Sequence, residues 1–164
     1  MASNPQIILI DGPAGSGKTT LSSKLQSEFN CQVVHLDDHY NGWDEALNSE
    51  LTSILDLLVS NFLAGIESEI STYDWHQSKF SGKRLISPGK ILIIEGVGAG
   101  QSAIRNRAST LYWVEADSHI AMQRVLERDG EEYRERIQSW QLREAKHFSH
   151  ERTREFADFI ISTT

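Results

Sequence analysis

Apolar residues in this chain form short runs, separated by longer segments in which they recur every three or four positions. The short runs are apolar on both faces, which is typical of strands buried in a parallel sheet. The segments between them have the period of a helix with one buried side. The expected strands cover residues 6–10, 31–36, 90–94, 111–114 and 159–161, and the expected helices cover residues 18–29, 44–66, 99–108 and 118–149.

Two stretches contain residues that interrupt regular structure. Gly130 lies within the last helical segment and is expected to break it. The segment 71–89 is polar and contains Gly82, Pro88 and Gly89, so it is expected to be a loop.

Strands that alternate with helices predict an α/β fold in three layers, with a central parallel sheet of about five strands flanked by helices. The length of 164 residues suits one compact domain over residues 1–164. In such sheets, ligands bind at the carboxyl ends of the strands. Three expected strands end in acidic or glycine residues, at Asp11-Gly12, Asp37-Asp38 and Glu95-Gly96.

The strongest motif follows the first strand and has the spacing of a P-loop. It reads Gly12-Pro13-Ala14-Gly15-Ser16-Gly17-Lys18-Thr19, with Thr20 in the same helical turn. Glycines allow several backbone N–H groups to point at one anion, and the helix that begins near Lys18 adds its positive end. Lys18 is expected to reach the β- and γ-phosphates and to act in catalysis, and Thr19 is expected to bind Mg²⁺. The motif therefore predicts the binding of a nucleoside triphosphate, namely ATP with Mg²⁺.

Carboxylates at the ends of the second and third strands are candidates for the reaction itself. Asp37 and Asp38 could orient an acceptor hydroxyl, take its proton or approach a bound metal. Glu95 ends an apolar strand in the position of a Walker B acid, which holds Mg²⁺ directly or through water. The predicted metal ligands are therefore Thr19, Asp37 and Glu95. Each acid has a structural alternative, because aspartate is common in turns and glutamate at helix starts.

Arginines in the second half of the chain could neutralise a phosphoryl group during transfer. Arg124 and Arg128 are four positions apart and share a helix face, and we expect them to act in catalysis. They lie in a predicted lid over approximately residues 124–150, with Gly130 as its hinge. Arg105 is a candidate for the acceptor side. The alternative for any one of these arginines is a solvated surface charge.

A polar and aromatic cluster, Tyr73-Asp74-Trp75-His76, lies within the expected loop. Aromatic rings can stack on a flat substrate, and His76 could donate a hydrogen bond to it or be a plain surface histidine. These four residues are therefore candidates for binding the acceptor.

Composition limits the classes of partner. A net charge of −7 with 24% charged residues does not favour a general nucleic-acid binder. No run approaches the roughly 18 apolar residues of a membrane span, and the amino-terminal residues lack a secretory signal pattern. Cys31 is the single cysteine, which excludes an internal disulfide. We expect a cytoplasmic protein that acts on a small molecule, with homo-oligomer formation left open.

Taken in order, four blocks of the chain resemble the uridine kinase-like members of the P-loop nucleoside and nucleotide kinases. They are the P-loop, then Asp37-Asp38-His39-Tyr40, then Tyr73-Asp74-Trp75 followed by Ile93-Ile94-Glu95-Gly96, and finally residues 124–129 with residues 156–161. The resemblance implies that Asp37 is the catalytic base and that Tyr40 belongs to the acceptor site. Between Tyr40 and Tyr73, the sequence gives no clear sign of the substrate-binding hairpin of that family.

The leading hypothesis is an ATP-dependent kinase that transfers the γ-phosphoryl group to a hydroxyl of a nucleoside-like substrate. Kinases for a nucleoside monophosphate, a sugar acid or a vitamin precursor are alternatives within the same class. A nucleotide-binding regulator is the alternative outside enzymes, because a P-loop alone does not fix function.

Overall fold

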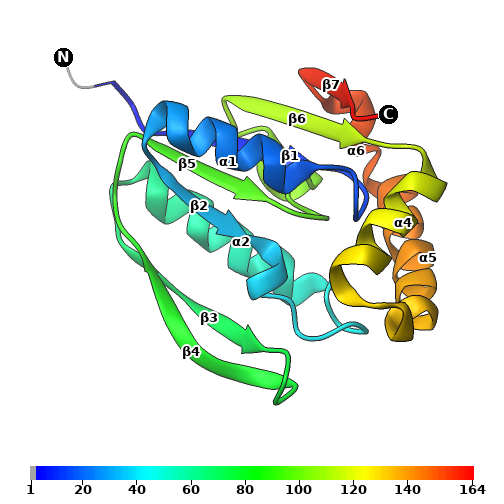
Figure 1. Ribbon diagram of the computed structural model, residues 1–164. Helices are drawn as coiled ribbons and strands as arrows, with labels where there is room; N and C mark the ends of the chain where they lie inside the picture. Colours follow the sequence, from blue (N-terminus) through cyan, green and yellow to red (C-terminus); the bar gives the residue numbers. More distant parts are fainter. Residues whose placement is uncertain (1–2) are drawn as a thin grey trace.

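The computed structural model describes residues 3–164 as three layers built on a five-stranded parallel sheet (Figure 1). The strands lie in the order β2-β5-β1-β6-β7. Their bounds are Gln6–Asp11 for β1, Gln32–His35 for β2, Ile91–Glu95 for β5, Thr110–Glu115 for β6 and Phe159–Ser162 for β7. The predicted strands and the predicted α/β class are confirmed.

The central strand β1 shows why this sheet is buried on both faces. Side chains alternate across a strand, so Ile7 and Leu9 enter the core on one face while Ile8 and Ile10 enter the core on the other. β1 pairs with β5 on one side and with β6 on the other, in parallel register. Two separate apolar cores therefore hold the middle of the sheet.

Helices supply the other half of each core. α1 (Lys18–Phe29) packs on the face of Ile8 and Ile10 through Leu25. α2 (Ser49–Leu63) packs on the opposite face. It begins later than the predicted start at residue 44, because the Asn48 side chain caps it by accepting the backbone N–H of Leu51 at 3.0 Å.

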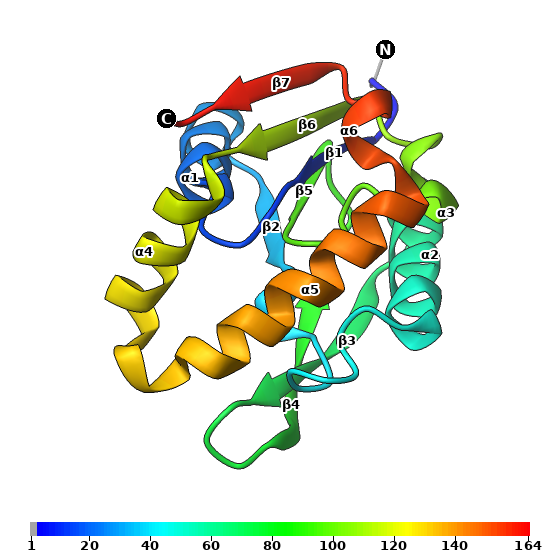
Figure 2. The same cartoon turned by 90° about the vertical axis from the view of Figure 1, so that its right-hand side faces the viewer.

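The remaining helices follow the third and fourth sheet strands. They are α3 (Ser102–Arg105), α4 (Ser118–Asp129), the 3-10 helix η2 (Glu131–Tyr133), α5 (Arg134–Glu151) and α6 (Thr153–Phe156). Gly130 ends α4 with φ 112°, as the predicted break requires. In Figure 2, α5 lies in front of the sheet, on the side to which the strand arrows of Figure 1 point. No helix within residues 3–164 is long and apolar enough to cross a membrane.

The predicted loop over residues 71–89 is wrong, because the structure has a two-stranded antiparallel hairpin there. Its strands are β3 (Ser68–Asp74) and β4 (Lys79–Ile86), which project below the sheet in Figure 1. The hairpin has little buried surface, so the alternation that marks a half-buried strand is weak. Gly82 adopts φ 91° inside β4, which is also unusual for a strand. A hairpin is thus present after α2, and Tyr73 lies in its first strand.

The carboxylate of Asp11 joins the end of β1 to the loop after β5. It is fully buried and accepts the backbone N–H groups of Gly12 at 2.7 Å, Gly98 at 3.1 Å and Gly100 at 2.8 Å. Burial raises its pKa to about 6, because the removal of water outweighs the three hydrogen bonds. The Asp11 side chain therefore fixes the backbone that follows β1 and the backbone that follows β5. The sequence places candidate site residues in both segments.

We predict that Asp11→Asn lowers the free energy of unfolding by about 1–3 kcal/mol, measured by urea denaturation at pH 8. One carboxylate oxygen accepts Gly12 and Gly98 while the other accepts Gly100, so an amide nitrogen would face one of these buried N–H groups. Asp44→Asn is the control, since Asp44 is 80% exposed and pairs only with Arg143 at the surface. Equal stability of the two variants would contradict this role of Asp11.

Candidate functional site

The P-loop, residues 12–19, has a backbone that only glycine can follow at three positions. Gly12, Gly15 and Gly17 have φ angles of 145°, 78° and 107°. A Cβ on Gly12 would lie 1.9 Å from the carbonyl oxygen of Val114, and one on Gly15 would lie 2.2 Å from that of Ala121. The loop is therefore wedged against the end of β6 and against α4, and its shape is fixed by close backbone contact.

The same loop has the features of a phosphate site. Among the residues that the structure describes, the backbone N–H groups of Gly15 and Gly17 have no hydrogen-bond partner. α1 begins at Lys18, so its positive end points at the loop. The Lys18 ammonium group is mostly buried and donates to the carbonyl of Pro13 at 2.8 Å, which keeps it at the mouth of the loop. These donors fit the phosphates of a nucleotide.

Two carboxylates lie at the ends of the neighbouring strands β2 and β5. Asp37 lies in the 3-10 helix η1 (Leu36–Asp38) after β2, and Glu95 is the last residue of β5. Solvent reaches Asp37, yet the protein atoms crowded around it raise its pKa, as does the nearby charge of Glu95, while Lys18 lowers it. The predicted acids are therefore brought together. Thr19, the third predicted metal ligand, is exposed at the start of α1.

His35 supports Glu95 and was missed by sequence reasoning. The two residues are register partners in the pairing of β2 with β5, and His35 Nδ1 lies 2.5 Å from Glu95 Oε1. The hydrogen bond to Glu95 raises the pKa of His35. His35 therefore orients the Glu95 carboxylate. Because the contact is to Oε1, Oε2 is left for another partner.

The two predicted lid arginines have different surroundings. Arg128 is close enough to Asp37 and Glu95 for their charges to raise its pKa, although its hydrogen-bond partner is Asp129 at 2.7 Å. Arg124 instead donates to the carbonyl of Gly15 at 3.2 Å and to the hydroxyl and carbonyl oxygens of Thr163. Arg128 thus faces the carboxylates, while Arg124 joins α4 to the P-loop and the end of the chain.

The hairpin brings one predicted aromatic residue to the site. Trp75 Nε1 donates to the backbone carbonyl of Asp37 at 3.0 Å, and Tyr73 packs edge-on against Trp75 with ring centroids 4.9 Å apart. Asp74 caps the hairpin turn by accepting the backbone N–H groups of His76 and Gln77. His76 is exposed at that turn. The structure therefore brings Trp75 to Asp37, packs Tyr73 against Trp75 and gives Asp74 a turn-forming contact.

Three other predicted acceptor residues have contacts of different kinds. Asp38 is exposed beside Asp37. Tyr40 is 2% exposed, and its hydroxyl donates to the carbonyl of Val97 at 2.6 Å. The guanidinium of Arg105 stacks 3.9 Å from the ring of Phe156 and donates to the carbonyl of Glu151. Arg105 therefore holds the end of α5, and its contacts give no support to acceptor binding.

A group of aromatic residues beside the site was also missed. Trp43 packs on Trp75, on Tyr133 of η2 and on Trp140 of α5, with ring centroids 5.6 to 6.3 Å apart. These rings come from the hairpin, from the loop after η1 and from the predicted lid. A sequence signal existed, because four tryptophans are many for 164 residues, but it did not show which ones meet.

Glu144 of α5 is the remaining missed residue. Its side chain is buried, and Oε2 accepts the backbone N–H of Ala14 in the P-loop and Nε1–H of Trp140, each at 3.0 Å. Burial raises its pKa to about 7. Helical spacing marks this face of α5 as buried, but nothing in the sequence shows that it reaches the P-loop.

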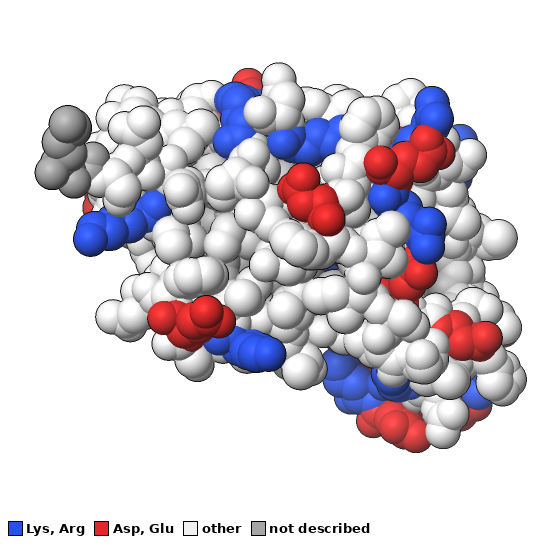
Figure 3. Space-filling view, turned by 90° about the horizontal axis from the view of Figure 1, so that it is seen from above, with Lys and Arg blue, Asp and Glu red and all other residues white. Residues whose placement is uncertain are grey.

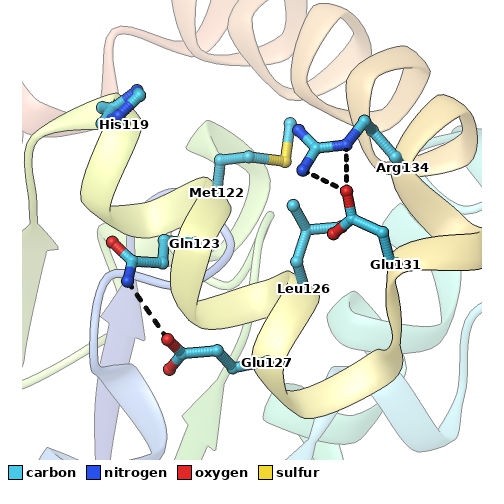
Figure 4. Close-up of a pocket in the computed structure, with 7 residues that line it drawn as sticks. All are labelled: His119, Met122, Gln123, Leu126, Glu127, Glu131 and Arg134. Atoms are coloured by element: carbon cyan, nitrogen blue, oxygen red, sulfur yellow. Dashed lines mark hydrogen bonds and ion pairs between the residues drawn. The ribbon is translucent and has the colours of Figure 1, made fainter.

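A separate hollow of about 380 Å³ lies between α4 and η2, outside this site (Figure 4). Four of its polar side chains form two pairs, Glu131 with Arg134 at 2.5 Å and Gln123 with Glu127 at 3.2 Å. The surface charges show a similar balance. Seen from above (Figure 3), lysines and arginines are interspersed with acids on that face, without an extended region of one sign.

The three-layer fold, the P-loop and the facing carboxylates define a phosphotransferase of the P-loop kinase class. A family model described as the AAA domain matches residues 8–148, and the chain belongs to this family. Within the class it resembles the uridine kinases. It is 26% identical, over 181 aligned residues, to a uridine kinase of Limosilactobacillus reuteri (strain DSM 20016), with 96% of this chain and 83% of that protein covered.

Solved structures show the same fold at lower identity. A possible uridine kinase from Bacillus stearothermophilus superposes with a TM-score of 0.67 and 21% identity, covering 99% of this chain and 91% of that one. A candidate fructose transport system kinase from Silicibacter sp. TM1040 superposes with a TM-score of 0.77 and 17% identity, covering 97% and 90%. The fold is therefore shared by kinases whose names point to different acceptors.

We predict that Gly12→Ala weakens the binding of MgADP at least tenfold, measured by isothermal titration calorimetry. Its Cβ would lie 1.9 Å from the Val114 carbonyl oxygen at φ 145°, so the loop must shift, and a shift of about 1 Å can cost on the order of 100-fold in function. Gly65→Ala is the control, because Gly65 has φ 72° with no atom within 4 Å of its would-be Cβ. Unchanged affinity in Gly12→Ala would contradict the tight fit of the loop.

Proposed function

We propose that this protein transfers the γ-phosphoryl group of ATP to a hydroxyl group of a nucleoside-like small molecule. The observation that carries the proposal is the position of Asp37. The positive charge of Lys18 in the P-loop favours the ionised form of its carboxyl group. Its backbone carbonyl accepts Nε1–H of Trp75 from the hairpin. One residue thus connects the phosphate side of the site to an aromatic surface that could hold the acceptor.

The roles of the charged residues follow from that arrangement. Lys18 and the free N–H groups of the P-loop would hold the phosphates, and Arg128 would stabilise the charge that develops as the phosphoryl group moves. Asp37 would orient the acceptor hydroxyl and take its proton as the new phosphorus–oxygen bond forms and ADP leaves. A Mg²⁺ ion held through Thr19, Asp37 and Glu95 would neutralise charge on the phosphate oxygens.

The aromatic surface supports a flat or ring-shaped acceptor. Tyr73, Trp75 and Trp43 form a chain of ring contacts beside Asp37, and Trp75 is 39% exposed. Such rings can stack on a nucleobase or on the apolar face of a sugar. The names of the similar uridine kinases favour a nucleoside, and a small-molecule kinase of this kind would act in the cytoplasm.

A coupled assay of ADP release tests the function directly. The acceptors to be compared are uridine and other nucleosides, nucleoside monophosphates, fructose, sugar acids and vitamin precursors. Release stimulated by nucleosides supports the proposal, while release stimulated only by another class would replace the acceptor and keep the kinase. Binding of ATP without stimulation by any acceptor would favour a nucleotide-binding regulator.

We predict that Asp37→Asn lowers kcat about 100-fold or more while leaving the Kd for ATP nearly unchanged. An amide keeps the size of the side chain but cannot take the proton of the acceptor. Asp38→Asn is the matched control, since Asp38 is the adjacent exposed carboxylate, and we expect less than about a tenfold loss from it. Near-normal turnover of Asp37→Asn would show that another group is the base.

A further inference from the structure

Glu144 places a carboxylate directly on the P-loop. The side chain comes from α5 and is 5% exposed. One of its oxygens, Oε2, accepts the N–H of Ala14 and Nε1–H of Trp140, each at 3.0 Å. Trp140 is itself buried against Tyr40 and Trp43, so it holds the carboxylate in this position.

The charged groups around Glu144 are those of the phosphate site. Lys18 at the start of α1 favours its ionised form, and Asp11 at the end of β1 opposes it. Burial raises the pKa of Tyr40, which lies after η1, and the nearby carboxylates, Glu144 among them, raise it further. Burial raises the pKa of Glu144 to about 7, so the carboxyl exchanges a proton near neutral pH.

A carboxylate in this position resembles part of the ligand for which the loop is built. P-loop N–H groups and the P-loop lysine are donors for phosphate oxygens, and a carboxylate presents the same kind of anionic acceptor. An ionised Glu144 and the terminal phosphate of a nucleotide would lie close together at the mouth of the loop. The two anions would repel each other, because burial leaves little water to screen them.

We propose that Glu144 is an autoinhibitory anion that occupies one donor of the phosphate loop and takes up a proton when a nucleotide binds. In the free protein the ionised side chain ties α5 to the P-loop. Protonation weakens this tie and loosens the hold on α5, which is joined through η2 to Gly130 and to the helix that carries Arg128. The proposal rests on nucleotide binding by the P-loop, as in the proposed function, and adds an internal competitor for it.

The test compares the affinities of wild type and Glu144→Gln for a nonhydrolysable ATP analogue with Mg²⁺, by isothermal titration calorimetry. The amide keeps an oxygen for Ala14 but has no charge, so we expect the Kd to fall about tenfold. Glu135→Gln is the matched control on α5, because Glu135 is exposed and its substitution makes the same change in net charge. Trp140→Phe removes the second anchor of Glu144 and is expected to tighten binding to a smaller extent.

Proton uptake provides a readout that a purely structural contact would not change. A phosphate beside Glu144 favours its protonated form, so wild-type binding at pH 7 should take up a proton and weaken as pH rises from 6 to 8. Titrations in buffers of different ionisation enthalpy measure this uptake. The phosphates of the analogue titrate equally in both proteins, so the difference between wild type and Glu144→Gln reports Glu144 alone.

The outcomes separate the two proposals. Tighter binding by Glu144→Gln with reduced proton uptake supports the autoinhibitory anion. Unchanged or weaker binding by a folded Glu144→Gln, with the wild type binding normally, overturns it and leaves the kinase proposal intact. Failure of both proteins to bind the analogue overturns nucleotide binding by the P-loop, and this inference with it.

Discussion

The parallel register of β1, β5 and β2 is the constraint on which the site depends. Ile10 of β1 is opposite Glu95, and Glu95 is opposite His35 of β2, so the three strands end at the same level. Each strand is followed directly by residues of the candidate site: the P-loop after β1, Asp37 after β2 and the Gly96–Gly100 loop after β5. A slip by one residue would reverse every side chain of the moved strand and separate these groups. The buried carboxylate of Asp11 holds two of these turns together through three N–H groups.

The parts of this arrangement that sequence predicted are those determined by neighbours along the chain. The apolar runs gave the strands, the glycine spacing gave the P-loop, and acids directly after strands gave Asp37 and Glu95. Each of these signals combines a local pattern with a general property of parallel sheets. No knowledge of distant contacts was needed, because the carboxyl ends of parallel strands always meet at one edge.

The parts that sequence did not predict depend on contacts between distant residues. The β3–β4 hairpin is mostly exposed, so it lacks the buried alternation by which strands are recognised. His35 looks like an ordinary strand residue until β2 pairs with β5. Glu144 meets Ala14 across 130 positions, so helical spacing can mark its face of α5 as buried but cannot show that it reaches the P-loop. Arg124 and Arg128 share a helix face, but Arg124 binds Gly15 and Thr163 at the two ends of the chain, whereas Arg128 pairs with its neighbour Asp129.

The balance of charge at the site bears on how an acidic protein could bind a polyanion. Positive groups are present, but nearby carboxylates would have to be neutralised. Lys18 and Arg128 are the cations that face the strand ends, and they are met there by four carboxylates, those of Asp11, Asp37, Glu95 and Glu144. Burial raises the pKa of Glu144 to about 7, so this carboxyl can lose its charge near neutral pH, whereas the carboxylate of Asp11 is held by three backbone N–H groups. The remaining pair, Asp37 and Glu95, offers oxygens to a divalent cation that would arrive with the phosphates. In the proposed function, the negative charge of a nucleotide would be accommodated by a proton on Glu144 and by a divalent cation beside Asp37 and Glu95, and the P-loop would supply fixed positive charge between them.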